Sequence, residues 1–195
     1  LGVTVAKRAQ VLSWLFNRKF GIGIAGTHGK TTTSSMIAMI LEQAGLTPTV
    51  AIGGELCDIG VNAKLGTGPY MVAELDESDG SFEEFQPNIS IVTNADWDHV
   101  DHYPTLDSVI QAYKRFILKT KPGGICVLCG EDPGLNNMMT VLPADRNVER
   151  YGFGTSWDWG AYDIIHKSGG GVSFSVCHKG KHVTDMILSV SGDHN

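Results

Sequence analysis

The stretch Gly26-Thr27-His28-Gly29-Lys30-Thr31-Thr32 decides the fold of this chain. It lies between an apolar run, Phe20 to Ala25, and a segment from Thr31 to Ala44 whose apolar residues have helical spacing. A strand, a glycine turn, a lysine, a hydroxyl residue and a helix follow one another in phosphate-binding loops. Glycines let backbone N–H groups approach phosphate oxygens, and the start of a helix favours an anion. The stretch therefore predicts a nucleoside triphosphate site, with Lys30 on the β- and γ-phosphates and the Thr31 hydroxyl on Mg²⁺.

This loop is shorter than the common pattern, which has four residues between its first glycine and the Gly-Lys pair. Here only two residues separate Gly26 from Gly29. Glycine turns also join buried strands to helices in proteins that bind no phosphate. The flanking strand and helix, and the two threonines directly after Lys30, favour the phosphate-binding interpretation.

Composition and charge limit the class of partner. The 195 residues carry a formal net charge of −6, and 42% are hydrophobic and 18% charged, as in a globular protein with one good core. The negative charge argues against a nucleic-acid partner, whose binding needs a basic face. No stretch approaches the roughly 20 apolar residues of a membrane span, and the first residues lack a signal-peptide pattern. We expect a cytoplasmic protein that binds neither nucleic acid nor a membrane.

The cysteines do not form a disulfide framework at this chain length. They are Cys57, Cys126, Cys129 and Cys177. The second and third have C-x-x-C spacing, but they lie in an apolar run, Ile125 to Cys129, that is typical of a buried strand. Residues three apart on a strand face opposite sides, so the two sulfurs are not placed to bind one ion. We expect buried free thiols.

Apolar strands that alternate with helices predict an α/β fold with a mostly parallel sheet, a phosphate-binding loop and flanking helices. The expected strands are Thr49–Ile52, Tyr70–Leu75, Ile89–Thr93 and Ile125–Cys129. The expected helices are Val5–Phe16, Thr31–Ala44, Thr105–Leu118 and Pro133–Val141. After Tyr151, short alternating runs predict a small antiparallel β annex near the C-terminus, with strands at Tyr162–His166, Val172–His178 and Met186–Val190.

Two of the expected strand ends are acidic. One run continues from Glu74 to Gly80, and the other contains Asp96, Asp98, His99, Asp101 and His102. Ligands of open α/β sheets gather beyond the carboxyl ends of strands, where a carboxylate beside a phosphate loop can hold Mg²⁺. The second run could instead hold zinc or manganese, because imidazole suits those ions better. Both runs are also compatible with solvated loops and helix caps, and the spacing leaves these alternatives open.

Three motifs resemble those of the Mur ligases. They are Ala25–Thr32, Ala73–Phe82, and Val92–Asn94 continuing to Asp98–Asp101. Tyr151–Gly154 and Gly192–Asn195 also fit, so the resemblance covers nearly the whole chain. The histidine in the glycine loop and the E-x-D-E-S-D run are typical of the branch that joins L-alanine to UDP-N-acetylmuramate. The resemblance implies a three-domain enzyme, with residues 20–195 as its central ATP-binding domain and residues 1–19 as the tail of the N-terminal domain and a connecting helix.

By resemblance, the full enzyme transfers phosphate from ATP to the muramic carboxylate, and the alanine amine then attacks the acyl phosphate in peptidoglycan precursor synthesis. By position, the resemblance assigns the catalytic roles to Lys30, Glu74 and His99. Thr31, Glu74 and His99 are the implied Mg²⁺ ligands. The implied ATP-binding residues are Gly26, Thr27, His28, Gly29, Lys30, Thr31, Thr32, His194 and Asn195.

Several alternatives stay open at this point. Sister branches hold the second metal with a carbamylated lysine, and Lys114 lies where an ungapped match would put it. The alanine-adding branch usually lacks that residue, so an exposed helix lysine is the favoured interpretation. A murein peptide ligase would add a recycled tripeptide to the same sugar nucleotide. Outside the ligases, Thr93–Asp96 superficially resembles a guanine-reading motif of nucleotide switches, and a kinase would release a phosphorylated product.

Overall fold

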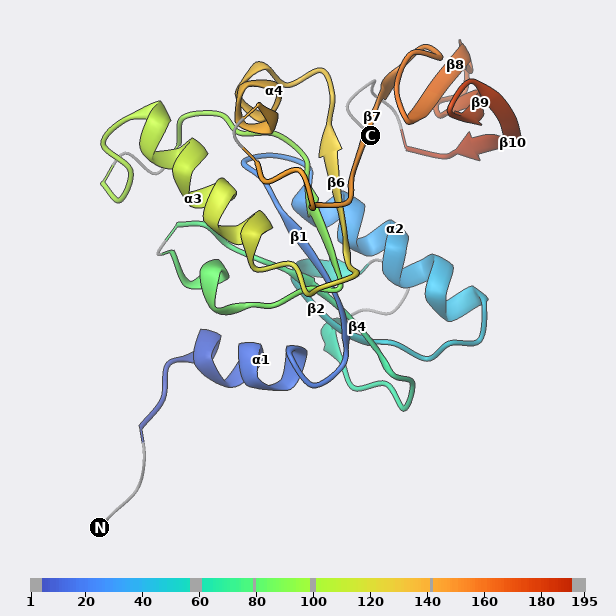
Figure 1. The fold of residues 1–195 in the computed structure, drawn as a ribbon. Coiled ribbons are helices and arrows are strands. Elements are labelled where there is room, and N and C mark those ends of the chain that lie inside the picture. Colours follow the sequence, from blue (N-terminus) through green and yellow to red (C-terminus); the bar gives the residue numbers. More distant parts are fainter. Residues whose placement is uncertain (1–4, 57–60, 79, 99–100, 141, 191–195) are drawn as a thin grey trace.

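The structure, a computed structural model, describes residues 5–56, 61–78, 80–98, 101–140 and 142–190 (Figure 1). In these residues ten strands form one sheet, in the order β10-β9-β8-β7-β6-β5-β1-β4-β2-β3. The strands are β1 Phe20–Ala25, β2 Thr49–Leu56, β3 Val61–Lys64, β4 Tyr70–Glu74, β5 Ile89–Val92, β6 Ile125–Cys129, β7 Val148–Phe153, β8 Trp159–His166, β9 Val172–His178 and β10 Lys181–Leu188.

The strands from β2 to β8 that lie side by side pair in parallel, which confirms the mostly parallel sheet. The pairs β2–β3, β8–β9 and β9–β10 are antiparallel, which confirms the C-terminal β annex. The annex is not separate from the main sheet, because β8 continues it by pairing in parallel with β7. Figure 1 shows β8, β9 and β10 at one end of the molecule, away from the central strands.

The helices cover the sheet on both faces. They are α1 Arg8–Phe16, α2 Lys30–Gln43, α3 Leu106–Leu118 and α4 Pro133–Met139, with a short 3₁₀ helix, η1, at Ser81–Glu84. Aromatic and aliphatic residues of α1, η1, α3 and α4 pack on one face of the sheet, whereas residues of α2 pack on the other. Figure 1 shows α2 and α3 on opposite sides of β1.

The sequence of β1 explains how helices pack on both faces of the sheet. Ile22 and Ile24 point to the face that α2 covers, while Gly21, Gly23 and Ala25 point to the other. A Cβ on Gly21 would lie 2.3 Å from the ring of Phe16, so the small residues of β1 let α1 approach the sheet closely.

Helix α3 buries one continuous face, because Val109, Ala112, Tyr113, Phe116 and Ile117 recur at helical spacing. The Thr105 side chain caps its start by accepting a 3.1 Å hydrogen bond from the Ser108 N–H. The helix therefore begins one residue later than the sequence predicts, at Leu106, with Thr105 as its cap.

Other boundaries differ from the sequence prediction. Helix α1 begins at Arg8 rather than Val5, and β2 continues to Leu56 rather than ending at Ile52. Sequence analysis missed β3, η1 and β7 altogether. Strand β7 contains Glu149 and Arg150 at its centre, so it lacks the apolar run by which buried strands are recognised.

The topology places a switch point between β1 and β5. The chain leaves β1 through α2 to reach β2 on one side of the sheet, and it leaves β5 through α3 to reach β6 on the other. Ligands of open α/β sheets bind beyond the carboxyl ends of the strands at such points. In the described part of the chain, no helix is both long enough and apolar enough to cross a membrane.

Candidate functional site

The glycine loop after β1 lies directly against the end of β5. Gly26 has a φ of +131°, and a Cβ there would lie 2.1 Å from the Thr93 Oγ1 atom, so only glycine permits this approach. Gly29 has a φ of +82° and caps the start of α2 in the left-handed conformation. The first N–H groups of α2 have no acceptor within the helix, and they therefore lie at the loop.

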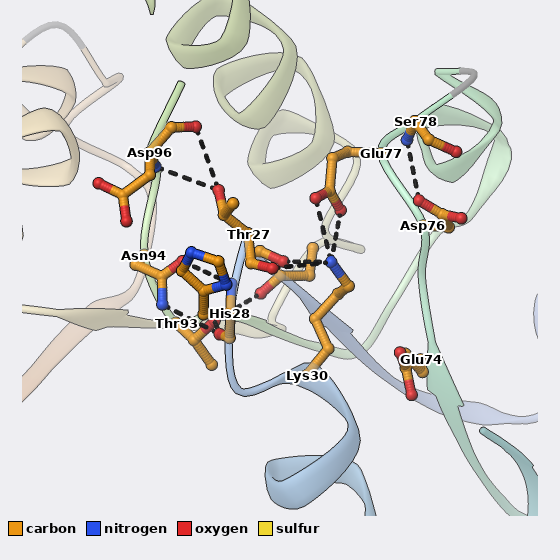
Figure 2. A network of polar contacts seen from close by, with 12 residues as sticks. Thr27, His28, Lys30, Glu74, Asp76, Glu77, Ser78, Thr93, Asn94 and Asp96 are labelled. Atoms are coloured by element: carbon orange, nitrogen blue, oxygen red, sulfur yellow. Dashed lines mark hydrogen bonds and ion pairs between the residues drawn. The ribbon is translucent and has the colours of Figure 1, made fainter. Parts of the chain in front are cut away.

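Side chains after β5 hold the backbone of this loop (Figure 2). The Asn94 amide accepts a 2.8 Å hydrogen bond from the His28 N–H and donates one of 3.0 Å to the His28 carbonyl. The Thr93 hydroxyl donates to the same carbonyl at 2.6 Å. The Thr27 hydroxyl donates to the Asp96 carbonyl and accepts from the Asp96 N–H, both at 3.1 Å. The end of β5 thus fixes the short loop from outside.

The ammonium of Lys30 lies inside the loop. Its Nζ atom donates to the Gly26 carbonyl at 2.5 Å and lies 3.4 Å from the Thr27 carbonyl. It also contacts both carboxylate oxygens of Glu77, at 3.0 and 3.1 Å. The side chains of this ion pair are only 14% and 3% exposed, so water screens it weakly. Figure 2 shows the lysine reaching from the start of α2 towards Glu77.

A hydroxyl and a carboxylate meet beside the lysine. The Thr31 hydroxyl lies 3.1 and 3.0 Å from the two carboxylate oxygens of Glu74. Glu74 is the last residue of β4 and pairs with Ile24 of the neighbouring β1. The Gly53 N–H donates to the Glu74 carboxylate at 2.9 Å and fixes its direction. The structure therefore brings together the two described side chains that the sequence predicts to hold Mg²⁺, and both offer the oxygen ligands that this ion prefers.

Two tyrosines surround Glu77. The Tyr103 hydroxyl donates to the Glu77 backbone carbonyl at 2.8 Å. Tyr113, from α3, is fully buried, and burial together with the negative charge of Glu77 raises the pKa of its hydroxyl. Glu77 lies within the first acidic run, but the sequence pattern predicts no role for it. The lysine it contacts is 47 residues away, so spacing alone carried no signal for this pair.

The second acidic run does not converge on the loop through its described carboxylates. Asp96 meets Thr27 through backbone atoms, and its side chain is exposed, as are those of Asp98, Asp101 and His102. Within the described ranges, no three His, Cys, Asp or Glu side chains gather as a metal site. His99 lies outside the described residues, so its assignment as a metal ligand stays a prediction.

The remaining predictions have mixed outcomes. Thr32 lies in the first turn of α2 at the loop, whereas His194 and Asn195 lie outside the described residues. Lys114 is a half-buried residue of α3 rather than a fully solvated one. The three described cysteines are free thiols: Cys126 and Cys177 are buried and Cys129 is half-buried, close to the expectation.

A pocket of about 220 Å³ lies elsewhere, at the amino ends of the parallel strands β6 and β7. Its lining includes Gly123, Gly124 and Asn147, which precede β6 and β7 and so lie at the amino ends of these parallel strands. The loop lies at the carboxyl end of β1. We therefore assign the functional site from the converging polar side chains and not from this pocket.

Comparisons with known proteins identify the family of the chain. Residues 24–195 match the model of the Mur ligase middle domain. The UDP-N-acetylmuramate–L-alanine ligase of Pelotomaculum thermopropionicum is 50% identical over 194 residues, which span all of this chain and 42% of that protein. The chain thus spans about two fifths of the length of the curated relatives it matches.

Two solved structures extend the comparison to the fold. The UDP-N-acetylmuramate:L-alanyl-gamma-D-glutamyl-meso-diaminopimelate ligase of Neisseria meningitides has a TM-score of 0.83 and 28% identity, over 95% of this chain and 60% of its own. The UDP-N-acetylmuramate–alanine ligase of Thermotoga maritima has a TM-score of 0.77 and 29% identity, over 95% of this chain and 40% of its own. Because its loop, fold and sequence all match, this chain belongs to the Mur ligase family and corresponds to the middle domain.

Proposed function

We propose that this chain is the ATP-binding middle domain of a UDP-N-acetylmuramate–L-alanine ligase. The observation that carries the proposal is the meeting of the glycine loop, the Lys30 ammonium and the Thr31–Glu74 pair at the carboxyl end of β1. A triphosphate needs amide donors, a cation and a metal site at one place, and this arrangement offers all three.

Mg²⁺ fits the donors present. The Thr31 hydroxyl and the Glu74 carboxylate are hard oxygen ligands at contact distance from each other, next to the loop. When bound, the ion would neutralise charge on the phosphate oxygens. His99 would hold a second ion by family position, and His194 and Asn195 would contact the adenine.

The chain's own residues have clear tasks in the reaction. Negative charge accumulates on the γ-phosphoryl group as it passes to the muramic carboxylate. Lys30 and the loop N–H groups stabilise that charge, because they are fixed before the reaction begins. The alanine amine then attacks the carbonyl carbon of the acyl phosphate, phosphate leaves with the bonding electrons, and the amine loses a proton to form the amide.

Sequence identity favours alanine as the acceptor. The curated relatives compared, at 38–50% identity, are named for L-alanine. The two solved structures do not separate the acceptors by identity, at 29% for the alanine ligase and 28% for the Neisseria meningitides ligase, whose name gives a peptide acceptor. The tripeptide reaction is nevertheless the second candidate, because that structure has the higher TM-score of the two compared above. Both candidates activate the same carboxylate and differ only in the amine.

The test is phosphate release by the full-length enzyme with ATP and UDP-N-acetylmuramate, with either L-alanine or the tripeptide as acceptor. We expect turnover with alanine and little with the tripeptide. The reverse preference would support the second candidate. A clear preference for GTP over ATP, or phosphate release that needs no acceptor, would count against this ligase.

A further inference from the structure

Glu77 is a buried carboxylate to which the proposed mechanism gives no task. It is 2% exposed, although Glu is among the residues least often buried without a charged partner. Its partner is Lys30, the residue proposed to stabilise the transferring phosphoryl group. A carboxylate next to an anionic substrate repels it, so its presence at this place calls for a physical reason.

The geometry of the ammonium supplies that reason. A lysine Nζ carries three protons in a tetrahedral arrangement and has no preferred rotation of its own. Two strong acceptors hold this one: the Gly26 carbonyl at 2.5 Å and the Glu77 carboxylate at 3.0 and 3.1 Å. The third contact, to the Thr27 carbonyl at 3.4 Å, is weak. A phosphate oxygen can take over this third proton while both strong contacts remain.

Glu77 is itself held in place. The Tyr103 hydroxyl and the Gly80 N–H both donate to its backbone carbonyl, at 2.8 and 3.0 Å. Its side chain lies near the fully buried Tyr113. Because its backbone carbonyl is held by two donors and its side chain is buried, Glu77 is suited to orient the lysine and is poorly suited to move away when the nucleotide arrives.

We infer that Glu77 is a positioning residue: it holds the Lys30 ammonium so that one N–H is directed at the triphosphate. The inference rests on the proposed function, since it assumes that Lys30 meets the phosphates of ATP. It assigns to the second glutamate of the E-x-D-E-S-D run a task distinct from that of Glu74, which pairs with the Thr31 hydroxyl instead.

The position of the lysine and the charge of Glu77 have opposite effects on the kinetics. Loss of orientation weakens the contact when charge develops on the phosphoryl group, and this lowers kcat. Removal of a negative charge near the triphosphate favours ATP binding, and this does not raise KM. A fall in kcat with an unchanged or lower KM for ATP is therefore the expected signature of Glu77→Gln.

The experiment measures phosphate release by the full-length enzyme at varied Mg-ATP. Glu77→Gln should lower kcat about 10- to 100-fold, with KM for ATP unchanged or reduced. Glu83→Gln is the matched control, because Glu83 pairs with Arg115 at 2.9 Å in a partly exposed ion pair and not with Lys30. The control should keep both constants within about twofold of the wild type.

Two other results would overturn the inference. Unchanged kcat with a lower KM would mean that Glu77 only competes with the phosphates, and unchanged kinetics with a lower Tm would mean that its role is structural. If Glu77→Gln does not fold, Tyr103→Phe keeps both charges but removes one anchor of Glu77; it should lower kcat with little change in KM, and an unchanged kcat would count against the inference.

A further variant separates this inference from the proposed function. If Lys30→Ala retains normal turnover, the assignment of the loop itself fails. If Lys30→Ala loses turnover while Glu77→Gln keeps it, only the role of Glu77 is wrong.

Discussion

The loop end of the sheet and the three C-terminal strands use polar side chains differently. Around the loop, contacts join segments far apart in the chain: Lys30 with Glu77 across 47 residues, and His28 with Asn94 across 66. In β8–β10, the side-chain contact of Ser175 with Asp185 joins neighbouring strands of one hairpin, and it is exposed. The comparison teaches that substitutions at the loop act on a structure assembled from several elements, whereas those in β8–β10 act locally.

The largest effect should come from Lys30→Ala, which removes the ammonium that contacts the Gly26 carbonyl inside the loop. We expect the full-length enzyme to lose at least about 100-fold in phosphate release, as is typical when a preorganised donor is removed from a charged transition state. Lys181→Ala, at an exposed lysine of β10, should leave the rate unchanged. Equal rates for the two variants would erase the contrast between the regions.

Gly26→Ala and Gly180→Ala sharpen the comparison for the backbone. Both glycines have positive φ, but a Cβ on Gly26 would meet Thr93 Oγ1 at 2.1 Å, whereas nothing lies within 4 Å of one on Gly180. We expect Gly26→Ala to lower the free energy of unfolding by about 3 kcal/mol or more, from strain plus a clash. Gly180→Ala should cost about 1 kcal/mol from backbone strain alone.

Urea denaturation of both variants measures this difference. A smaller loss for Gly26→Ala than for Gly180→Ala would show that the loop can move away from β5, contrary to the close contact seen here.

Sequence patterns predicted the strands and helices that have a regular apolar pattern or are bounded by glycine and proline turns. The strand Ile125–Cys129 and the strand Val172–His178 have their predicted bounds, because their apolar or alternating runs are interrupted by turns at both ends. Strand β7 was missed, since Glu149 and Arg150 at its centre remove that signal. It is a strand because β6 and β8 pair with it on both sides, which is a property of the tertiary structure.

The same distinction holds at the site. Lys30, Thr31 and Glu74 could be proposed from the sequence because motif and strand-end position single them out one at a time, and the structure places the last two within 3.1 Å of each other. Glu77 and Asn94 also lie in the recognised motifs, but the sequence predicts no role for them, because their contacts with the loop are made in the folded chain. Such contacts depend on the β1–β4 and β1–β5 pairings, which no local pattern specifies.

Asn94→Ala should have an intermediate effect. It removes both amide contacts with the His28 backbone, so we expect the free energy of unfolding to fall by about 1 kcal/mol and ATP affinity to fall several-fold. Ser175→Ala removes an exposed contact of β9 and should change stability by no more than about 0.5 kcal/mol. Denaturation and calorimetric titration with a non-hydrolysable ATP analogue measure the two effects. An unaltered affinity in Asn94→Ala would show that the loop keeps its shape without this contact.

The smallest effect at neutral pH should come from Tyr113→Phe, because the buried Tyr113 hydroxyl has no hydrogen-bond partner among the described residues. Its consequence appears in alkali. Burial, with the charge of Glu77, raises the folded-state pKa of Tyr113 above the unfolded value of about 10, so the folded chain keeps a proton that the unfolded chain loses. The contribution of this hydroxyl to the free energy of unfolding is therefore fully present below about pH 10. Above pH 10 it falls by about 1.4 kcal/mol per pH unit.

Tyr113→Phe should reduce the dependence of the unfolding free energy on pH above about pH 10 by the equivalent of one proton. Tyr151→Phe should do the same, since burial also raises the pKa of Tyr151. Urea denaturation between pH 8 and 11, at about half-unit steps, measures the slope for each variant and for both together. A slope that Tyr113→Phe leaves unaltered would mean that water reaches this hydroxyl. The interior between α3 and the loop would then be open, and the firm hold on Glu77 that distinguishes this end of the sheet would be lost.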